Sequence, residues 1–125
     1  MGQPVVHFEI IGNDPAKLRR YYGDLFGWEF DTSGPVPTEV SEPGSYGFVD
    51  GSASGGIDGG VGGGEGYDAH VVFYVGVPDV DAALAKAESL GGKRLMGPTR
   101  TPGIDLVVAQ FTDPEGNVIG LAGVS

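Results

Sequence analysis

The chain has 125 residues, which fits one domain of ordinary size that can bury a core without disulfides or metals. Its 17 acidic residues against 7 Lys and Arg give a net charge of −10, which argues against nucleic acid or an anionic membrane as a partner. The absence of cysteine rules out disulfides, thiolate metal sites and thiol nucleophiles. It also fits a reducing cytoplasm, where we expect a soluble protein.

The first predicted element is a strand over Val5 to Ile11, a run rich in β-branched and aromatic residues. Side chains alternate across a strand, so His7 and Glu9 share one face while Phe8 and Ile10 share the other. We expect the apolar face to pack on a helix and the polar pair to face away from it.

A helix is predicted to follow. Asn13 or Asp14 is a suitable N-cap, Pro15 suits the first helical position, and Gly27 ends the run. Four apolar residues recur at helical spacing: Leu18, Tyr22, Leu25 and Phe26. We expect the aromatic residues of this helix, Tyr21, Tyr22 and Phe26, to lie in the core.

Short strand-like segments follow this helix, at 28–31, 39–40 and 46–49 and near Ile57. The segment 51–66 holds nine glycines in sixteen residues. A phosphate-binding loop is excluded because no Lys-Ser or Lys-Thr follows and no helix opens directly after the glycines. A flexible connector is the better interpretation, or an edge strand whose backbone closely approaches a ligand or partner.

The second half repeats this order of elements. A strand is predicted over His70 to Val77, Asp79 caps a helix, and Gly91 and Gly92 end it. Three strands follow at 93–96, 106–111 and 118–121, with a turn at 113–116 before the last of them.

The two halves are an internal repeat. Shifting residues 7–30 forward by 65 positions superimposes Phe8 on Phe73, Asp14 on Asp79 and other key positions, so each half is predicted to be β-α-β-β-β. The same shift places the polar His7 on the apolar Val72. For the later strands a shift of 63 fits best, which places Ile57 on Gly120.

Several of these segments together resemble the vicinal oxygen chelate superfamily, which includes glyoxalase I, extradiol dioxygenases and bleomycin resistance proteins. The segments are His7-Phe8-Glu9-Ile10, Leu25-Phe26-Gly27-Trp28-Glu29, 75–84 and Asp113-Pro114-Glu115-Gly116-Asn117. The resemblance implies an α+β fold in which two βαβββ modules form a half-barrel cleft, often completed by a homodimer. One domain would span 1–125, with module one at about 4–64 and module two at about 67–125.

The resemblance also implies where a divalent metal would be held, namely on the first and last strands of each module. His7 matches one such position, whereas Val72, Gly120 and the position near Ile57 offer no ligand atom. We therefore expect no metal and no other cofactor. A displaced set remains conceivable, formed by His7, Glu9, Asp58 and His70.

In a cleft without metal, Glu9 and His7 are the candidate catalytic acid–base pair. The expected ligand-binding residues combine this pair with aromatic, apolar and amide side chains from the predicted strands: His7, Glu9, Trp28, Tyr46, Phe48, Val72, Tyr74 and Gln110. A carboxylate with apolar walls could exchange protons near neutral pH, and equally Glu9 and His7 could only satisfy each other inside a barrel.

Three functions are compatible with these residues. The favoured hypothesis is a metal-independent protein that binds a small molecule, as bleomycin resistance proteins do. The first alternative is a metal-free isomerase, epimerase or lyase that uses Glu9 and His7. The second is a metal-dependent lyase or dioxygenase similar to glyoxalase I. Whether the chain is an enzyme stays open at this point.

Overall fold

The computed structural model describes residues 2–124, which form seven strands, two α-helices and one short 3-10 helix. The chain divides into two compact units. The first unit contains residues 7–71, and the second contains residues 72–124 together with residues 2–6. The α+β class predicted from the sequence is confirmed.

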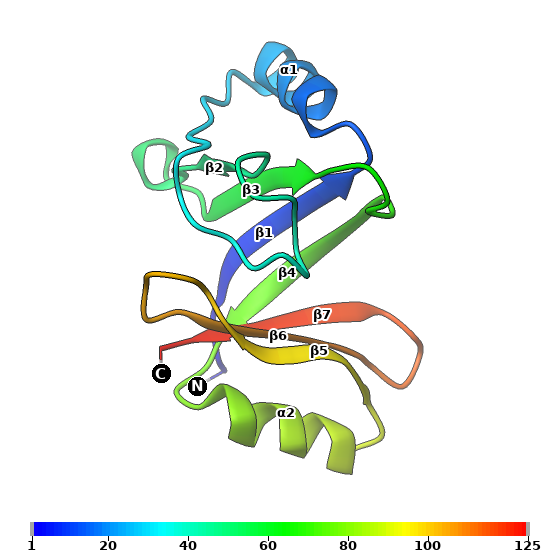
Figure 1. Cartoon of the computed structure of the whole chain (residues 1–125). Helices are drawn as coiled ribbons and strands as arrows, with labels where there is room; N and C mark the ends of the chain where they lie inside the picture. Colours follow the sequence, from blue (N-terminus) through cyan, green and yellow to red (C-terminus); the bar gives the residue numbers. More distant parts are fainter. Residues whose placement is uncertain (1, 125) are drawn as a thin grey trace. The chain divides into compact units, whose positions relative to one another are not determined.

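In the first unit a three-stranded sheet has the order β2-β3-β1, with β1 and β3 parallel and β2 antiparallel to β3. β3 is therefore the central strand of this sheet (Figure 1). The elements in chain order are β1 (Val5–Gly12), α1 (Pro15–Phe26), β2 (Gly47–Val49), the 3-10 helix η1 (Ser52–Ser54) and β3 (Asp58–Gly63).

The second unit follows the predicted βαβββ order. Its elements are β4 (His70–Gly76), α2 (Val80–Ser89), β5 (Lys93–Arg100), β6 (Val107–Thr112) and β7 (Val118–Gly123), and its sheet has the order β4-β7-β6-β5. α2 packs on this sheet (Figure 1) through a cluster formed by Val80, Leu84, Ala109 and Leu121. A second cluster contains Val72, Tyr74 and Val108.

Both helices begin and end close to the residues that the sequence indicated. The side chains of Asp14 and Asp79 accept hydrogen bonds from the backbone N–H groups of Lys17 and Ala82, as N-cap residues do. α1 ends at Gly27, whose φ of 73° favours glycine because a side chain would strain the backbone there.

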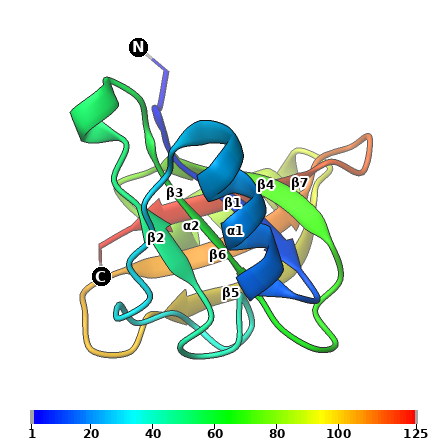
Figure 2. The ribbon, with the colours of Figure 1, turned by 90° about the horizontal axis from the view of Figure 1, so that it is seen from above.

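The expectation that the aromatic residues of α1 lie in the core is wrong for Tyr21 and Phe26, whereas Tyr22 is partly buried. Tyr21 is 60% exposed and Phe26 is 56% exposed, and none of the residues of α1 is fully buried. α1 lies over its sheet against β3 (Figures 1 and 2). Leu18 lies against Gly12 of β1 and Arg19 against Gly47 of β2, while Tyr21 stays on the exposed side of the helix.

Two expectations about the strands of the first unit are also corrected. The strand expected at 28–31 is reduced to a single bridge between Asp31 and Phe48, and 38–40 forms a turn. In the glycine-rich segment, Asp58–Gly63 form β3, which pairs with both β1 and β2 and is therefore neither a connector nor an edge strand. Neighbouring aromatic rings occupy the space that side chains would take at Gly59 and Gly60.

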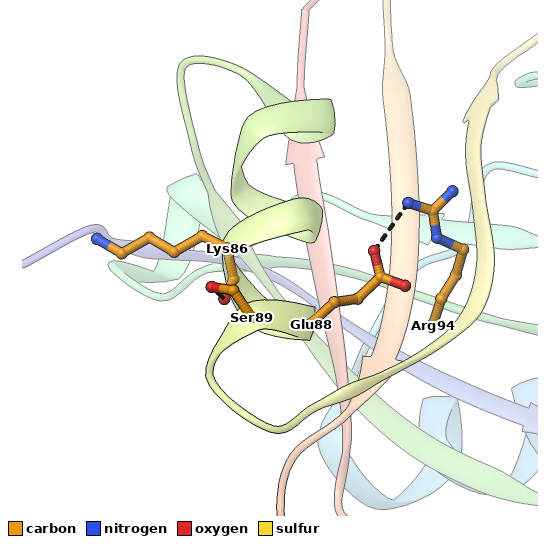
Figure 3. Close-up of polar contacts among 4 residues, drawn as sticks. All are labelled: Lys86, Glu88, Ser89 and Arg94. Carbon is orange, nitrogen blue, oxygen red and sulfur yellow. Dashed lines mark hydrogen bonds and ion pairs between the residues drawn. The ribbon is translucent and has the colours of Figure 1, made fainter.

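One polar contact connects the end of α2 to β5, where Arg94 donates to Glu88 at 3.0 Å (Figure 3). Within the last turn of α2, the Ser89 hydroxyl donates to the Lys86 carbonyl at 2.7 Å. The ion pair is exposed to solvent, so it adds little to stability. Over residues 2–124, no helix has both the length and the apolar character needed to span a membrane.

Candidate functional site

The candidate site lies on the face of the first-unit sheet opposite to α1. Alternation along β1 places His7, Glu9 and Ile11 on this face. The parallel register pairs His7 with Asp58 and Glu9 with Gly60. Since paired residues of adjacent strands point to the same side, β3 presents one carboxylate and then glycines beside the polar pair of β1.

Tyr46 crosses β3 to reach that pair. It directly precedes β2, and its ring lies over the glycines of the central strand. A Cβ atom built on Gly60 would fall within the ring of Tyr46, and one on Gly62 would lie 2.7 Å from Tyr46 Cδ2. The ring therefore occupies space that any other residue at these positions would fill.

The hydroxyl of Tyr46 connects the two predicted catalytic residues. Tyr46 Oη lies 2.7 Å from His7 Nε2 and donates a hydrogen bond to Glu9 Oε2 at 3.1 Å. Glu9 is 3% exposed, whereas His7 and Tyr46 are half-buried. The result is a hydrogen-bonded chain, His7–Tyr46–Glu9, that joins a partly accessible imidazole to a buried carboxylate.

The single proton of the hydroxyl fixes the polarity of this chain. When Tyr46 donates to Glu9, its oxygen can only accept from His7, so His7 Nε2 carries a proton and Nδ1 is the basic nitrogen. Once Nδ1 has gained a proton, both protons can shift by one hydrogen bond, which leaves Glu9 protonated, Tyr46 donating to Nε2 and His7 neutral with its proton on Nδ1. The chain can therefore pass the charge of a protonated His7 to Glu9 without moving a heavy atom.

The surroundings of His7 favour its neutral form. Burial lowers the pKa of His7 below its ordinary value of 6.5, and the nearby carboxylate of Asp58 opposes this shift in part. Asp58 is also held in place, since its Oδ1 accepts from the backbone N–H of Gly51 at 3.1 Å. Near pH 7 the imidazole is thus neutral and able to accept a proton.

Phe48 completes this group of side chains. Its ring centroid lies 6.4 Å from that of His7 with the planes 15° apart, and the ring of Tyr46 is similarly placed at 6.3 Å and 13°. Phe48 is 38% exposed, so an apolar ring lies at the surface next to the imidazole.

Three of the predicted residues lie together in the second unit. Val72 and Tyr74 are buried on β4, and Gln110 of β6 donates from Nε2 to Tyr74 Oη at 2.8 Å. Tyr74 pairs with Gly120 of β7, and a Cβ atom on Gly120 would fall within the Tyr74 ring. Here the tyrosine hydroxyl has an amide as its partner, where Tyr46 has a carboxylate and an imidazole.

The structure does not bring Trp28 to the His7 face. Its ring packs on Phe8, at a centroid distance of 5.1 Å, and on Tyr22 and Phe26 of α1. Phe8 alternates with His7 along β1 and so points to the α1 side of the sheet. Trp28 therefore belongs to the helix side of the first unit.

The register changes which residues correspond between the modules. Glu9 pairs with Gly60 in the first unit, and its repeat equivalent Tyr74 pairs with Gly120 in the second. The first-module equivalent of Gly120 is therefore Gly60, and the placement of Ile57 at that position is wrong. The sequence alignment failed there because the connections before the last strands differ in length.

The residues present do not fit the divalent metal that the resemblance implies. Of the four implied positions His7 alone carries a ligand atom, because Val72 is apolar and Gly60 and Gly120 are both covered by tyrosine rings. A divalent ion needs several converging donors. In the described part of the chain, no group of three or more His, Cys, Asp or Glu residues could hold a metal ion.

His70, a member of the displaced set considered above, lies away from His7. Its Nδ1 is 2.9 Å from the Asp68 carbonyl, and the residue lines a shallow cavity of about 640 Å³ between α1 and the ends of β1 and β4. The lining of this cavity includes Asn13, Lys17 and Tyr21, but neither His7 nor Glu9.

Sequence reasoning placed Tyr46 only among ligand-lining residues and missed its central position between His7 and Glu9. It also missed Gly60 and Gly62. The available signal was the spacing of these two glycines, which puts both on one face of a strand and leaves a recess there.

Comparisons with known proteins agree with this architecture. Residues 5–121 match the family model described as Glyoxalase/Bleomycin resistance protein/Dioxygenase superfamily. Comparison with curated proteins gave no match.

Among solved structures, a variant of Streptomyces coelicolor methylmalonyl-CoA epimerase in complex with 2-nitronate-propionyl-CoA is 18% identical, with a TM-score of 0.68 over 98% of each chain. A hypothetical protein from Bacillus halodurans is 11% identical, with a TM-score of 0.71 over 100% of this chain and 96% of that one. A superfamily member from Vibrio splendidus is 18% identical, with a TM-score of 0.57 over 98% and 99%. At these identities the likeness concerns the fold alone.

Proposed function

Because the chain belongs to the glyoxalase/bleomycin resistance protein/dioxygenase superfamily, we propose that it is a metal-independent acid–base enzyme acting on a small molecule. The reaction would move a proton at a carbon next to a carbonyl group, as an isomerase, epimerase or lyase does. The observation that carries this proposal is the chain of hydrogen bonds from half-buried His7 through Tyr46 to buried Glu9.

In the proposed step, neutral His7 removes the proton from the substrate carbon at Nδ1. The C–H bond breaks and its electron pair moves onto the carbonyl oxygen as an enolate. The imidazolium that forms can pass its Nε2 proton to Tyr46 while Tyr46 passes its own proton to Glu9, so the positive charge on the ring does not persist. The proton on Nδ1 then returns to the enolate carbon as the two protons of the hydrogen-bonded chain shift back, which restores neutral His7 and ionised Glu9.

Two further observations support this assignment. Burial keeps the pKa of His7 low, so its basic form prevails near pH 7, where a general base must act. A fold neighbour of this chain is an epimerase bound to a coenzyme A ester analogue, which makes carbonyl compounds of this kind the first substrates to test.

The test is exchange of substrate hydrogen for deuterium in D₂O, followed by mass spectrometry over a panel of methylmalonyl-CoA, propionyl-CoA and 2-oxo acids. We expect His7→Gln and Glu9→Gln to slow the exchange by about 10²-fold or more, the usual contribution of general acid–base catalysis. His70→Gln is the matched control, because it replaces the chain's other histidine outside the hydrogen-bonded group. Exchange at the unmodified rate in both His7→Gln and Glu9→Gln would refute the proposal.

Ligand binding without turnover is the second candidate. One support is that the hydroxyls of Tyr46 and Tyr74 are hydrogen-bonded within the protein, as purely structural groups are. The other is the exposed ring of Phe48 beside His7, which a ligand could contact. It predicts saturable binding by calorimetry with no deuterium exchange in any variant.

We propose further that the protein is a cytoplasmic homodimer, following the family resemblance. Light scattering after size-exclusion chromatography tests the dimer. A single species at the chain mass of 12.8 kDa would contradict it.

A further inference from the structure

β3 has glycines on both faces, and each face is covered by an aromatic ring from a neighbouring segment. On the His7 face, the ring of Tyr46 lies over Gly60 and Gly62, which we call the glycine recess. On the α1 face, the ring of Phe8 lies over Gly59. Gly59 and Gly60 are thus neighbours on one strand, and they differ in the ring that covers them, Phe8 for Gly59 and Tyr46 for Gly60.

The glycine recess lets Tyr46 lie close over β3. A Cβ atom built on Gly62 would lie 3.1 Å from Tyr46 Cα, and one on Gly60 would fall within the Tyr46 ring, so both the backbone and the ring of Tyr46 pass directly over the central strand. From that position its hydroxyl meets His7 and Glu9 of β1. A side chain at Gly60 or Gly62 would lift the ring and withdraw its hydroxyl.

We propose that Gly60 and Gly62 are positioning residues, which hold the Tyr46 hydroxyl between Glu9 and His7 by leaving the recess empty of side chains. This inference deepens the proposed function and rests on it for its kinetic consequence. Its geometric part, the bond between Tyr46 and His7, stands without any reaction. The spacing of 2.7 Å and 3.1 Å at the hydroxyl leaves little tolerance, because hydrogen bonds weaken steeply once the ring shifts.

A glycine that serves packing alone would make a different prediction. Adding a methyl group at Gly59 would disturb Phe8 on the α1 face, and adding one at Gly60 would disturb Tyr46 on the other. If both glycines are needed only for packing, both substitutions destabilise the protein and neither changes the proton arrangement of His7. If Gly60 positions Tyr46, only its substitution changes that arrangement.

The experiment compares Gly60→Ala with Gly59→Ala as the matched control and Tyr46→Phe as the reference for a lost hydroxyl. The readout is the ¹⁵N chemical shifts of the His7 ring at neutral pH, which report which nitrogen carries the proton. We expect the Nε2-protonated form to dominate in the unmodified protein and in Gly59→Ala. Gly60→Ala and Tyr46→Phe should both lose this preference.

The inference is overturned if Gly60→Ala keeps the ring shifts of the unmodified protein, or if Gly59→Ala changes them as much as Gly60→Ala does. Should Gly60→Ala fail to fold, as judged by circular dichroism, Gly62→Ala replaces it, because its Cβ meets the Tyr46 ring less closely. Deuterium exchange provides the kinetic arm, where misplacing Tyr46 should cost about 10²-fold while Gly59→Ala retains the rate. If the unmodified protein shows no exchange, the proposed function fails, and the ring shifts still decide the role of Gly60.

Discussion

The Tyr46 hydroxyl is predicted to stabilise the folded protein through its bond to a buried carboxylate. Tyr46→Phe removes that hydroxyl and keeps the ring over the glycine recess, so it creates no cavity in the sheet face. The hydroxyl's bonds to His7 and Glu9 are both lost, and the bond to Glu9 matters more because this residue is 3% exposed and cannot readily exchange it for water. Hydrogen bonds to a charged group contribute about 1.5–3 kcal/mol, and we expect a loss of that size.

Urea-induced unfolding followed by circular dichroism measures this loss. Tyr21→Phe is the matched control, because Tyr21 is 60% exposed and its substitution should stay within about 0.5 kcal/mol of the unmodified protein. Combining Tyr46→Phe with Glu9→Gln in a double-mutant cycle isolates the bond, and a coupling of about 1 kcal/mol or more is expected for groups in direct contact. A Tyr46→Phe variant as stable as Tyr21→Phe, with no coupling to Glu9, would refute the hydrogen-bonded chain.

Three further outcomes are expected. The pKa of His7 is lowered in the folded protein, so the unfolded chain takes up the proton first as pH falls below about 6.5. The unfolding free energy measured with urea should therefore be smaller at about pH 5.5 than at about pH 7.5. This decrease should be smaller in His7→Gln. Leu84→Ala should lower the unfolding free energy by about 2–5 kcal/mol, because Leu84 is fully buried between α2 and its sheet, and a loss under 1 kcal/mol would contradict that packing. Asp79→Ala should lower it by about 1 kcal/mol through loss of the α2 cap, and Asp79→Asn should restore most of this.

The parts of this fold that sequence reasoning identified are those set by local rules. Asp14 and Gly27 mark the ends of α1 because capping depends on backbone groups within a few residues. Alternation along a single strand placed His7 and Glu9 on one face without knowledge of any partner. These features need no information from distant segments.

The position of Tyr46 could not be found in this way. It depends on the order β2-β3-β1 and on the register of β3, and both are set by pairing between segments far apart in the chain. The glycine-rich segment shows the same limit. Its composition suits a flexible connector as well as a central strand, and what decides is whether the rings of Tyr46 and Phe8 lie against it.

Periodicity likewise identified α1 but not which side of it meets the sheet. Close approach at Gly12 and Gly47 turns Leu18 and Arg19 inward, which leaves Tyr21 exposed. A helical pattern of apolar residues cannot reveal this, because the inward side is chosen by small residues on the strands and not by the helix itself.

The register also explains why acid–base chemistry is expected in one module only. In both units a glycine on the last strand is covered by a tyrosine ring, Gly60 by Tyr46 and Gly120 by Tyr74. In the second unit the covering ring comes from the first strand of the module, at the position equivalent to Glu9, so no carboxylate can occupy that place.

In the first unit the ring comes from beside β2, which leaves the position on β1 available for Glu9. The glycine is therefore covered in both units, but only in the first unit does the tyrosine hydroxyl meet a titratable carboxylate, that of Glu9. Accordingly, Tyr74→Phe should leave the proton arrangement of His7 unchanged, whereas Tyr46→Phe should alter it.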